Sequence, residues 1–208
     1  MGDSTNLLPI SDEQAKLGQE IVGAARDAGG YLADLLGDLP KDLVSLLIGD
    51  RVKVWRVARL AKLWENARNR LQEDGIAEPV PPNLKLALPI LIAAADENRD
   101  ELQDLWARLL AATMNPNKER HFRQEFSHAL EKCDPIDAKV MVYFSQNGGA
   151  VANNEKSEMA KALEISLDEL LVSQRNLSNI GFVADYNGLT TGLMPFGREF
   201  LRTVSDFP

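Results

Sequence analysis

The chain has 208 residues, 45% hydrophobic content and a formal net charge of −8. This length permits one large domain or two small ones, each with its own core, and the negative charge gives no global attraction to nucleic acid or to anionic lipid. Cys133, the single cysteine, cannot form an internal disulfide, and no cationic, apolar leader opens the chain, so we expect a cytoplasmic protein.

The N-terminal part of the sequence predicts a flexible start and then an amphipathic helix. Residues 1–10 show no periodicity, whereas residues 11–39 open with a capping-box pattern and carry apolar residues at spacings of three and four. The polar face of this helix is acidic, and helices that lie on membranes are usually cationic there. We therefore expect it to pack against the protein or a second copy, with membrane contact as the alternative.

A second predicted helix, between Arg51 and Leu71, carries seven basic side chains against the single acid Glu65. Its local charge is thus +6, which leaves −14 for the rest of the chain. The basic side chains either form a solvated or internally paired face, or bind phosphates, nucleic acid or a lipid surface. The candidate anion-binding residues are Arg51, Lys53, Arg56, Arg59, Lys62 and Arg70.

The middle of the sequence predicts a connector and three further helices. Residues 75–83 contain three prolines and no periodicity, which is typical of a connector. Apolar patterns then predict helices over 84–95 and 102–113, and residues 119–132 predict one more polar helix. On that helix three side chains would share one face, namely His121, Glu125 and His128. Because no fourth ligand has matching spacing, we expect ordinary surface histidines and no metal.

A separate C-terminal module is predicted over residues 134–208. Asp134 and Pro135 resemble the N-cap and first residue of a helix that ends near Gln146. The run NGGAVANN reads as a flexible loop, and helices follow over 155–163 and from Ser166 to Gly181. Two short strands around Asn187 and Gly188 and a helix over 195–204 complete the module. The predicted fold is mainly α, with a helical region over 11–132 followed by a winged-helix-like module that contains a short β-hairpin.

The charge of this module disfavours DNA binding by the module alone. Residues 134–208 contain ten acidic and six basic side chains, a net charge of −4. A DNA-reading helix normally offers basic or polar side chains to phosphates and base edges. If the third helix of the module does read DNA, its candidate base-reading residues are Gln174, Arg175 and Asn179.

Three stretches together resemble the abortive infection alpha family, a bacterial group linked to phage defence. They are GDRVKVWRVARLAKLWENARNRL, DELQDLWARLLAATMNP and LSNIGFVADYNGLTTGLMPFGREFLRTV. The resemblance covers most of residues 39–204 and implies a biological context, because the family offers no catalytic motif to transfer to this chain.

No chemistry-bearing motif accompanies this resemblance. The sequence contains no nucleophile elbow, phosphate-binding loop or paired zinc cysteines, so we expect no enzyme activity, cofactor or small-molecule substrate. The favoured hypothesis is a phage-defence protein that acts through protein contact or self-association. The alternatives are a winged-helix DNA-binding regulator that uses the basic helix at 51–70, and an effector that perturbs membranes through its N-terminal amphipathic helices.

Overall fold

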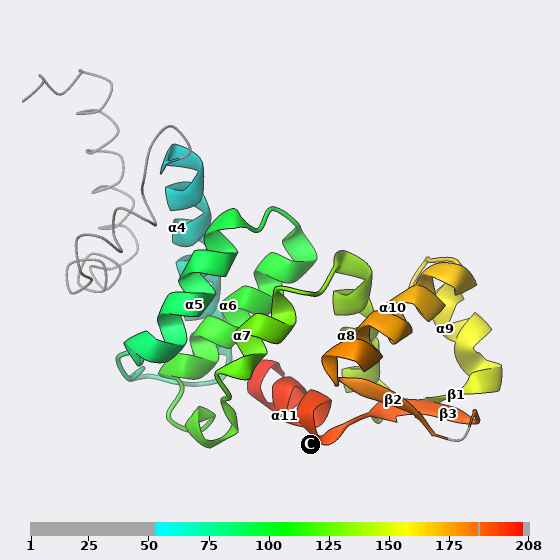
Figure 1. The fold of residues 1–208 in the computed structure, drawn as a ribbon. Coiled ribbons are helices and arrows are strands. Elements are labelled where there is room, and N and C mark those ends of the chain that lie inside the picture. Colours follow the sequence, from blue (N-terminus) through cyan, green and yellow to red (C-terminus); the bar gives the residue numbers. More distant parts are fainter. Residues whose placement is uncertain (1–52, 187, 206–208) are drawn as a thin grey trace, which may run out of the picture. The chain divides into compact units, whose positions relative to one another are not determined.

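The computed structural model describes residues 53–186 and 188–205 (Figure 1). The predicted helix over 11–39 lies outside the described residues. The chain divides into two compact units, Met1–Lys62 and Leu63–Pro208. Helix α4 (Lys53–Glu73) supplies the described part of the first unit and continues into the second. The domain boundary predicted beside Cys133 falls inside the second unit and stays a prediction.

The second unit is mainly helical with a small antiparallel sheet, which confirms the predicted fold class. After α4 its helices and 3₁₀ turns are α5 (Leu84–Asp96), α6 (Asp100–Met114), η1 (Glu119–His121), α7 (Glu125–Leu130), α8 (Pro135–Gln146), η2 (Asn153–Glu155), α9 (Lys156–Ala162), α10 (Leu167–Ile180) and α11 (Pro195–Val204). Its strands are β1 (Ala150–Ala152), β2 (Val183–Tyr186) and β3 (Thr190–Leu193). No helix among the described residues is both long and apolar enough to cross a bilayer.

Helix α6 forms the centre of this unit. Ten of its 15 residues are buried, and it packs against α5, α7, α8 and α11. The buried side chain of Gln103 donates hydrogen bonds to the backbone oxygens of Ala94 and Glu97, at 2.8 and 2.7 Å. The Ala94 oxygen also accepts from the backbone N–H of Glu97 at 3.3 Å, so Gln103 reinforces the C-terminal end of α5, where backbone oxygens lack the usual helical donors.

The single helix predicted over 119–132 is wrong, because the structure breaks it into η1 and α7. The Arg123 side chain donates hydrogen bonds to the backbone oxygens of Arg120 and Phe122, at 2.7 and 2.8 Å. In a continuous helix those oxygens would accept from backbone N–H groups four residues later. His121, Glu125 and His128 therefore do not share one helix face.

The glycine-rich run predicted as a flexible loop contains strand β1, which is a second correction. Ala150 pairs with Gly192 in an antiparallel ladder, and the backbone N–H of Leu193 donates to the oxygen of Gly149 at 2.8 Å. The sheet order is β1-β3-β2, so β3 is the central strand. A three-residue strand is too short for its alternating pattern to be read from sequence. The predicted hairpin formed by β2 and β3 is confirmed.

Helix α11 packs against the start of β2 through closely spaced aromatic rings, and its bounds agree with the sequence prediction. The rings of four residues, which we call the phenylalanine cluster, have neighbouring centroids 4.9–5.4 Å apart. These residues are Phe126 in α7, Phe182 before β2, and Phe196 and Phe200 in α11. Gly197 makes the approach possible, because a Cβ atom there would lie 2.2 Å from the backbone oxygen of Phe182.

We predict that Gly197→Ala destabilises the protein by roughly 3 kcal/mol, because a rigid backbone atom, and no flexible side chain, occupies the space of the added methyl group. Urea unfolding followed by circular dichroism measures this loss. Gly181→Ala is the matched control. Its φ of +90° strains any other residue but nothing lies within 4 Å, so its cost should stay near 1 kcal/mol. Equal losses in the two variants would contradict the steric argument.

Candidate interaction surface

Helix α10 is held at both ends by the caps that the sequence predicts. The Ser166 hydroxyl accepts a hydrogen bond from the backbone N–H of Glu169 at 3.1 Å, and the Glu169 carboxylate accepts one from the backbone N–H of Ser166 at 2.7 Å. This capping box lowers the pKa of Glu169, chiefly through the Ser166 backbone N–H. At the other end Gly181 adopts the left-handed conformation, in which glycine is favoured. The ends of α10 are therefore well defined.

A buried carboxylate joins α10 to α8. Asp137 is fully buried. It accepts hydrogen bonds from the Ser173 hydroxyl and the Asn176 amide, each at 2.6 Å, and from the backbone N–H of Asp134 at 2.9 Å. Burial raises the pKa of Asp137, although the hydrogen bonds from Ser173, Asp134 and Asn176 oppose the shift. Because two of the donors lie on α10, this network fixes which face of α10 turns inward.

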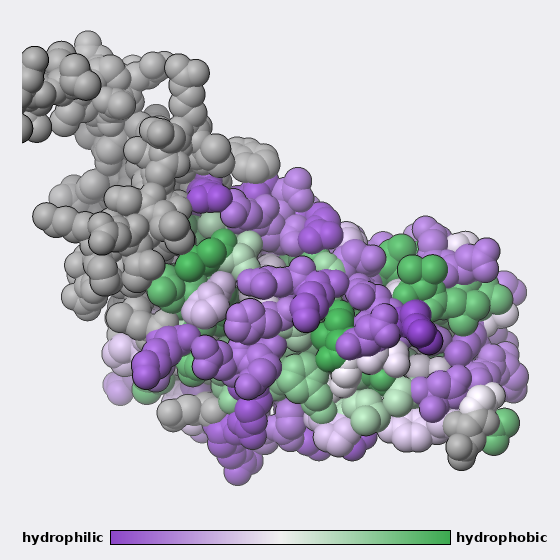
Figure 2. All heavy atoms as spheres, in the orientation of Figure 1, coloured by the Kyte–Doolittle hydropathy of each residue, from purple (hydrophilic) through white to green (hydrophobic). Residues whose placement is uncertain are grey.

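The outward side of α10 exposes apolar side chains to solvent. Leu170 and Leu177 are fully buried, whereas Leu167, Leu171 and Val172 are 41%, 43% and 67% exposed. Figure 2 shows hydrophobic surface in the region where α9 and α10 lie. We call Leu167, Leu171 and Val172 the α10 apolar patch. Sequence reasoning placed Leu171 on this helix but did not separate the exposed from the buried leucines.

The predicted base-reading residues lie in different environments. Gln174 points inward and is 6% exposed, whereas Arg175 and Asn179 are exposed. The exposed surface of α10 thus offers one basic side chain beside its apolar patch and the acids Asp168 and Glu169. The role of Gln174, Arg175 and Asn179 in DNA binding stays a prediction.

The candidate anion-binding residues lie on α4 or just before it. Arg51 and the side chain of Lys53 lie outside what the structure describes. Arg56 and Arg59 are partly buried and Lys62 is exposed. Arg70 forms an ion pair with Glu73 at 2.9 Å. Nothing in these positions tests anion binding, which stays a prediction.

His121 has an acidic partner, and Cys133 is buried. His121 Nδ1 lies 2.9 Å from Glu199 Oε2, and this hydrogen bond lowers the pKa of Glu199. Burial raises the pKa of the Cys133 thiol well above its usual range, which disfavours the nucleophilic thiolate. Within residues 53–186 and 188–205, no group of three His, Cys, Asp or Glu side chains is placed to hold a metal ion.

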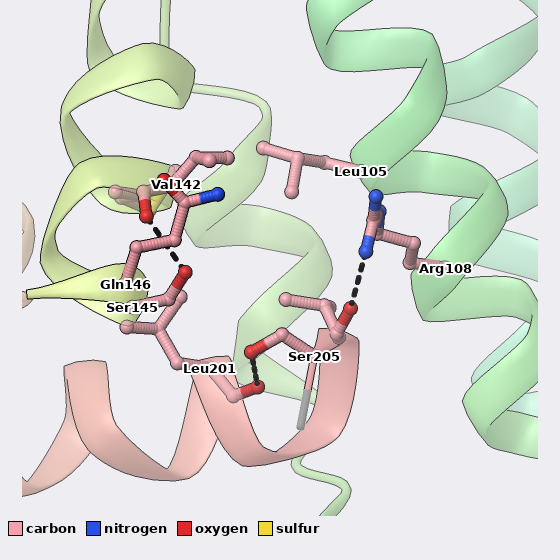
Figure 3. Close-up of a pocket in the computed structure, with 9 residues that line it drawn as sticks. Leu105, Arg108, Val142, Ser145, Gln146, Leu201 and Ser205 are labelled. Atoms are coloured by element: carbon pink, nitrogen blue, oxygen red, sulfur yellow. Dashed lines mark hydrogen bonds between the residues drawn. The ribbon is translucent and has the colours of Figure 1, made fainter. Parts of the chain in front are cut away.

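A hollow of about 280 Å³ lies between α6, α8 and α11 (Figure 3). Its polar side chains bond to nearby backbone. Arg108 donates to the oxygen of Val204 at 3.3 Å, Ser145 to Val142 at 2.7 Å, and Ser205 to Leu201 at 2.7 Å. An adjoining hollow of about 420 Å³ shares Leu105, Val142 and Gln146 with it. Two of these three shared residues, Leu105 and Val142, are apolar.

Comparison with known proteins gives one match. A family model described as abortive infection alpha matches residues 58–189, which is more than half of the chain and includes all of α5 to α10. No curated protein and no solved structure matches the chain.

The Asp137 network predicts a large loss of stability for Asp137→Ala. The substitution leaves the Ser173 hydroxyl, the Asn176 amide and a backbone N–H without their acceptor. Each buried donor without a partner costs about 1–3 kcal/mol, so we expect a total of roughly 3 kcal/mol or more in urea unfolding. Glu131→Ala removes an exposed carboxylate and should change stability by less than about 0.5 kcal/mol.

The stability difference between the wild type and Asp137→Ala should depend on pH. The pKa of Asp137 is raised in the folded state, so its contribution to stability is fully present below the unfolded pKa of about 4. That contribution decreases as the pH rises through the folded pKa. The stability difference between the wild type and Asp137→Ala should therefore be largest in acid and shrink toward neutral pH. A difference that grows with pH would contradict the raised pKa.

Proposed function

We propose that this chain, which belongs to the abortive infection alpha family, is a phage-defence protein without enzymatic activity that acts through protein contact at the α10 apolar patch. Family membership supports the biological context. The exposed residues Leu167, Leu171 and Val172 support the mode of action.

The single observation that carries the proposal is the chemistry of the outward face of α10. A helix that reads DNA neutralises phosphates with lysine and arginine and presents polar side chains to base edges. Here the outward face exposes three large apolar residues next to Asp168. Exposed apolar residues gathered on one element are typical of protein–protein contacts.

The proposal also includes a winged-helix class for the module over residues 134–208 and a cytoplasmic location for the protein. The chain order α8-β1-α9-α10-β2-β3, with sheet order β1-β3-β2, supports a winged-helix assignment in which α10 takes the place of the recognition helix. The buried, unpaired thiol of Cys133 supports a reducing, cytoplasmic environment. The membrane alternative depends on the amphipathic helices that the sequence predicts before residue 53, outside the described residues.

A phage infection assay tests this function. Phages of a broad panel should form fewer plaques on bacteria that express the wild-type chain than on a deletion strain. The double variant Leu171→Asp with Val172→Asp should abolish this difference, because charged side chains disfavour burial in an apolar contact. Leu189→Asp is the matched control, since Leu189 is 72% exposed and lies outside α10. Equal infection of the wild-type and deletion strains would refute the proposal, provided that immunoblots show equal protein levels.

The second candidate function is nucleic-acid binding through the basic segment between Arg51 and Leu71, which its local charge of +6 favours. Low-salt gel shifts with double-stranded DNA test it. A wild-type chain that binds at micromolar concentration, and loses binding in the triple charge reversal of Arg56, Arg59 and Lys62, would support this function. No shift by the wild-type chain would remove it. Leu171→Asp should leave this binding unchanged, because Leu171 lies on α10 and not on the basic segment.

A further inference from the structure

One face of α10 carries two apolar side chains between side chains of opposite charge. Asp168, Leu171, Val172 and Arg175 stand at positions i, i+3, i+4 and i+7, so they lie along one side of the helix. All four are exposed, and Val172 is 67% exposed. We call these four residues the α10 stripe. It places a negative charge toward one end of the helix, two apolar side chains in the middle and a positive charge toward the other end.

This pattern is complementary to itself when it is reversed. In a twofold symmetric contact each residue of one copy faces its mate on the other, and helices that cross the axis perpendicularly run antiparallel. If the axis passes between Leu171 and Val172, then Leu171 faces the partner's Val172, and Asp168 faces the partner's Arg175. A parallel arrangement would instead place like charges against each other.

We propose that a second copy of this chain covers the α10 stripe, through antiparallel pairing of the two α10 helices. The inference rests on the proposed function, because it names the partner at the same surface. The apolar centre supplies the area removed from water, and the charged ends select the orientation. The capping box, Gly181 and the Asp137 network hold α10 in place, so each copy presents the stripe already ordered.

The charges at the start of α10 favour a second copy of the chain over nucleic acid as the partner. Asp168 and Glu169 are both exposed at the start of α10, where they would repel phosphates. Four side chains from each copy make a small contact, and small contacts are weak and reversible. We therefore expect a dissociation constant between about 1 µM and 1 mM.

Sedimentation velocity of the full chain tests the pairing. The wild-type chain should shift from monomer to dimer as its concentration rises. Asp168→Arg gives two positive ends and Arg175→Glu gives two negative ends, so each variant alone should dimerise at least about tenfold more weakly. An equimolar mixture of the two variants should associate again, because each offers the charge that the other lacks.

Two further variants complete the experiment. The double variant Asp168→Arg with Arg175→Glu exchanges both ends and should recover self-association. Lys85→Glu makes a comparable charge change at an exposed position on α5 and should leave dimerisation unchanged. Circular dichroism confirms that each variant is folded; if Asp168→Arg disturbs the start of α10, then Arg175→Glu still decides, because it keeps Asp168. A wild-type chain that stays monomeric, or a mixture that fails to associate, would overturn the proposal.

The plaque assay separates this proposal from the proposed function. If the wild-type chain stays monomeric but Leu171→Asp with Val172→Asp abolishes protection, the α10 patch contacts a different protein and self-pairing is rejected. If the chain dimerises through the stripe but the same variant still protects, self-pairing stands and the proposed function fails.

Discussion

The close approach of α11 to the backbone of Phe182 is the contact on which the rest of this unit depends. Gly197 has no side chain, and the space of a Cβ atom is already occupied by the Phe182 oxygen. The rings of Phe196 and Phe200 can therefore reach Phe126 and Phe182. Because Phe126 belongs to α7 and Phe182 precedes β2, this one contact joins the helices before residue 133 to the sheet that follows them.

A polar contact holds α10 in place beside its buried leucines. Asp137 on α8 accepts hydrogen bonds from Ser173 and Asn176 on α10, and a buried carboxylate that loses its donors is costly. Rotation of α10 about its own axis would break both bonds. The network therefore determines which leucines enter the core and which remain on the surface.

The basic segment and the exposed apolar side chains of α10 lie in different parts of the chain. Seven basic side chains lie between Arg51 and Leu71, whereas the exposed surface of α10 combines apolar residues with the acids Asp168 and Glu169 and the base Arg175. A winged-helix-like module, which the sequence predicts over residues 134–208, would be expected to bind DNA through its third helix. The charge of −4 over residues 134–208 and the α10 apolar patch direct attention to protein contact.

Local signals in the sequence determined the helices of the C-terminal part. The caps at Asp134, Ser166 and Gly181 depend on hydrogen bonds between residues only a few positions apart, so a short stretch contains all of the information. The family resemblance is likewise present in contiguous motifs, and it agrees with the match over residues 58–189.

Only the tertiary structure decided the features that depend on distant residues. Strand β1 exists because Ala150–Ala152 pairs with β3, forty residues later in the chain, and the helix predicted over 119–132 breaks where the Arg123 side chain takes the backbone acceptors. The exposure of Leu171 and Val172 beside the buried Leu170 follows from the bonds between α8 and α10. Helical spacing alone could not separate these residues, because adjacent apolar positions on a helix allow more than one buried face.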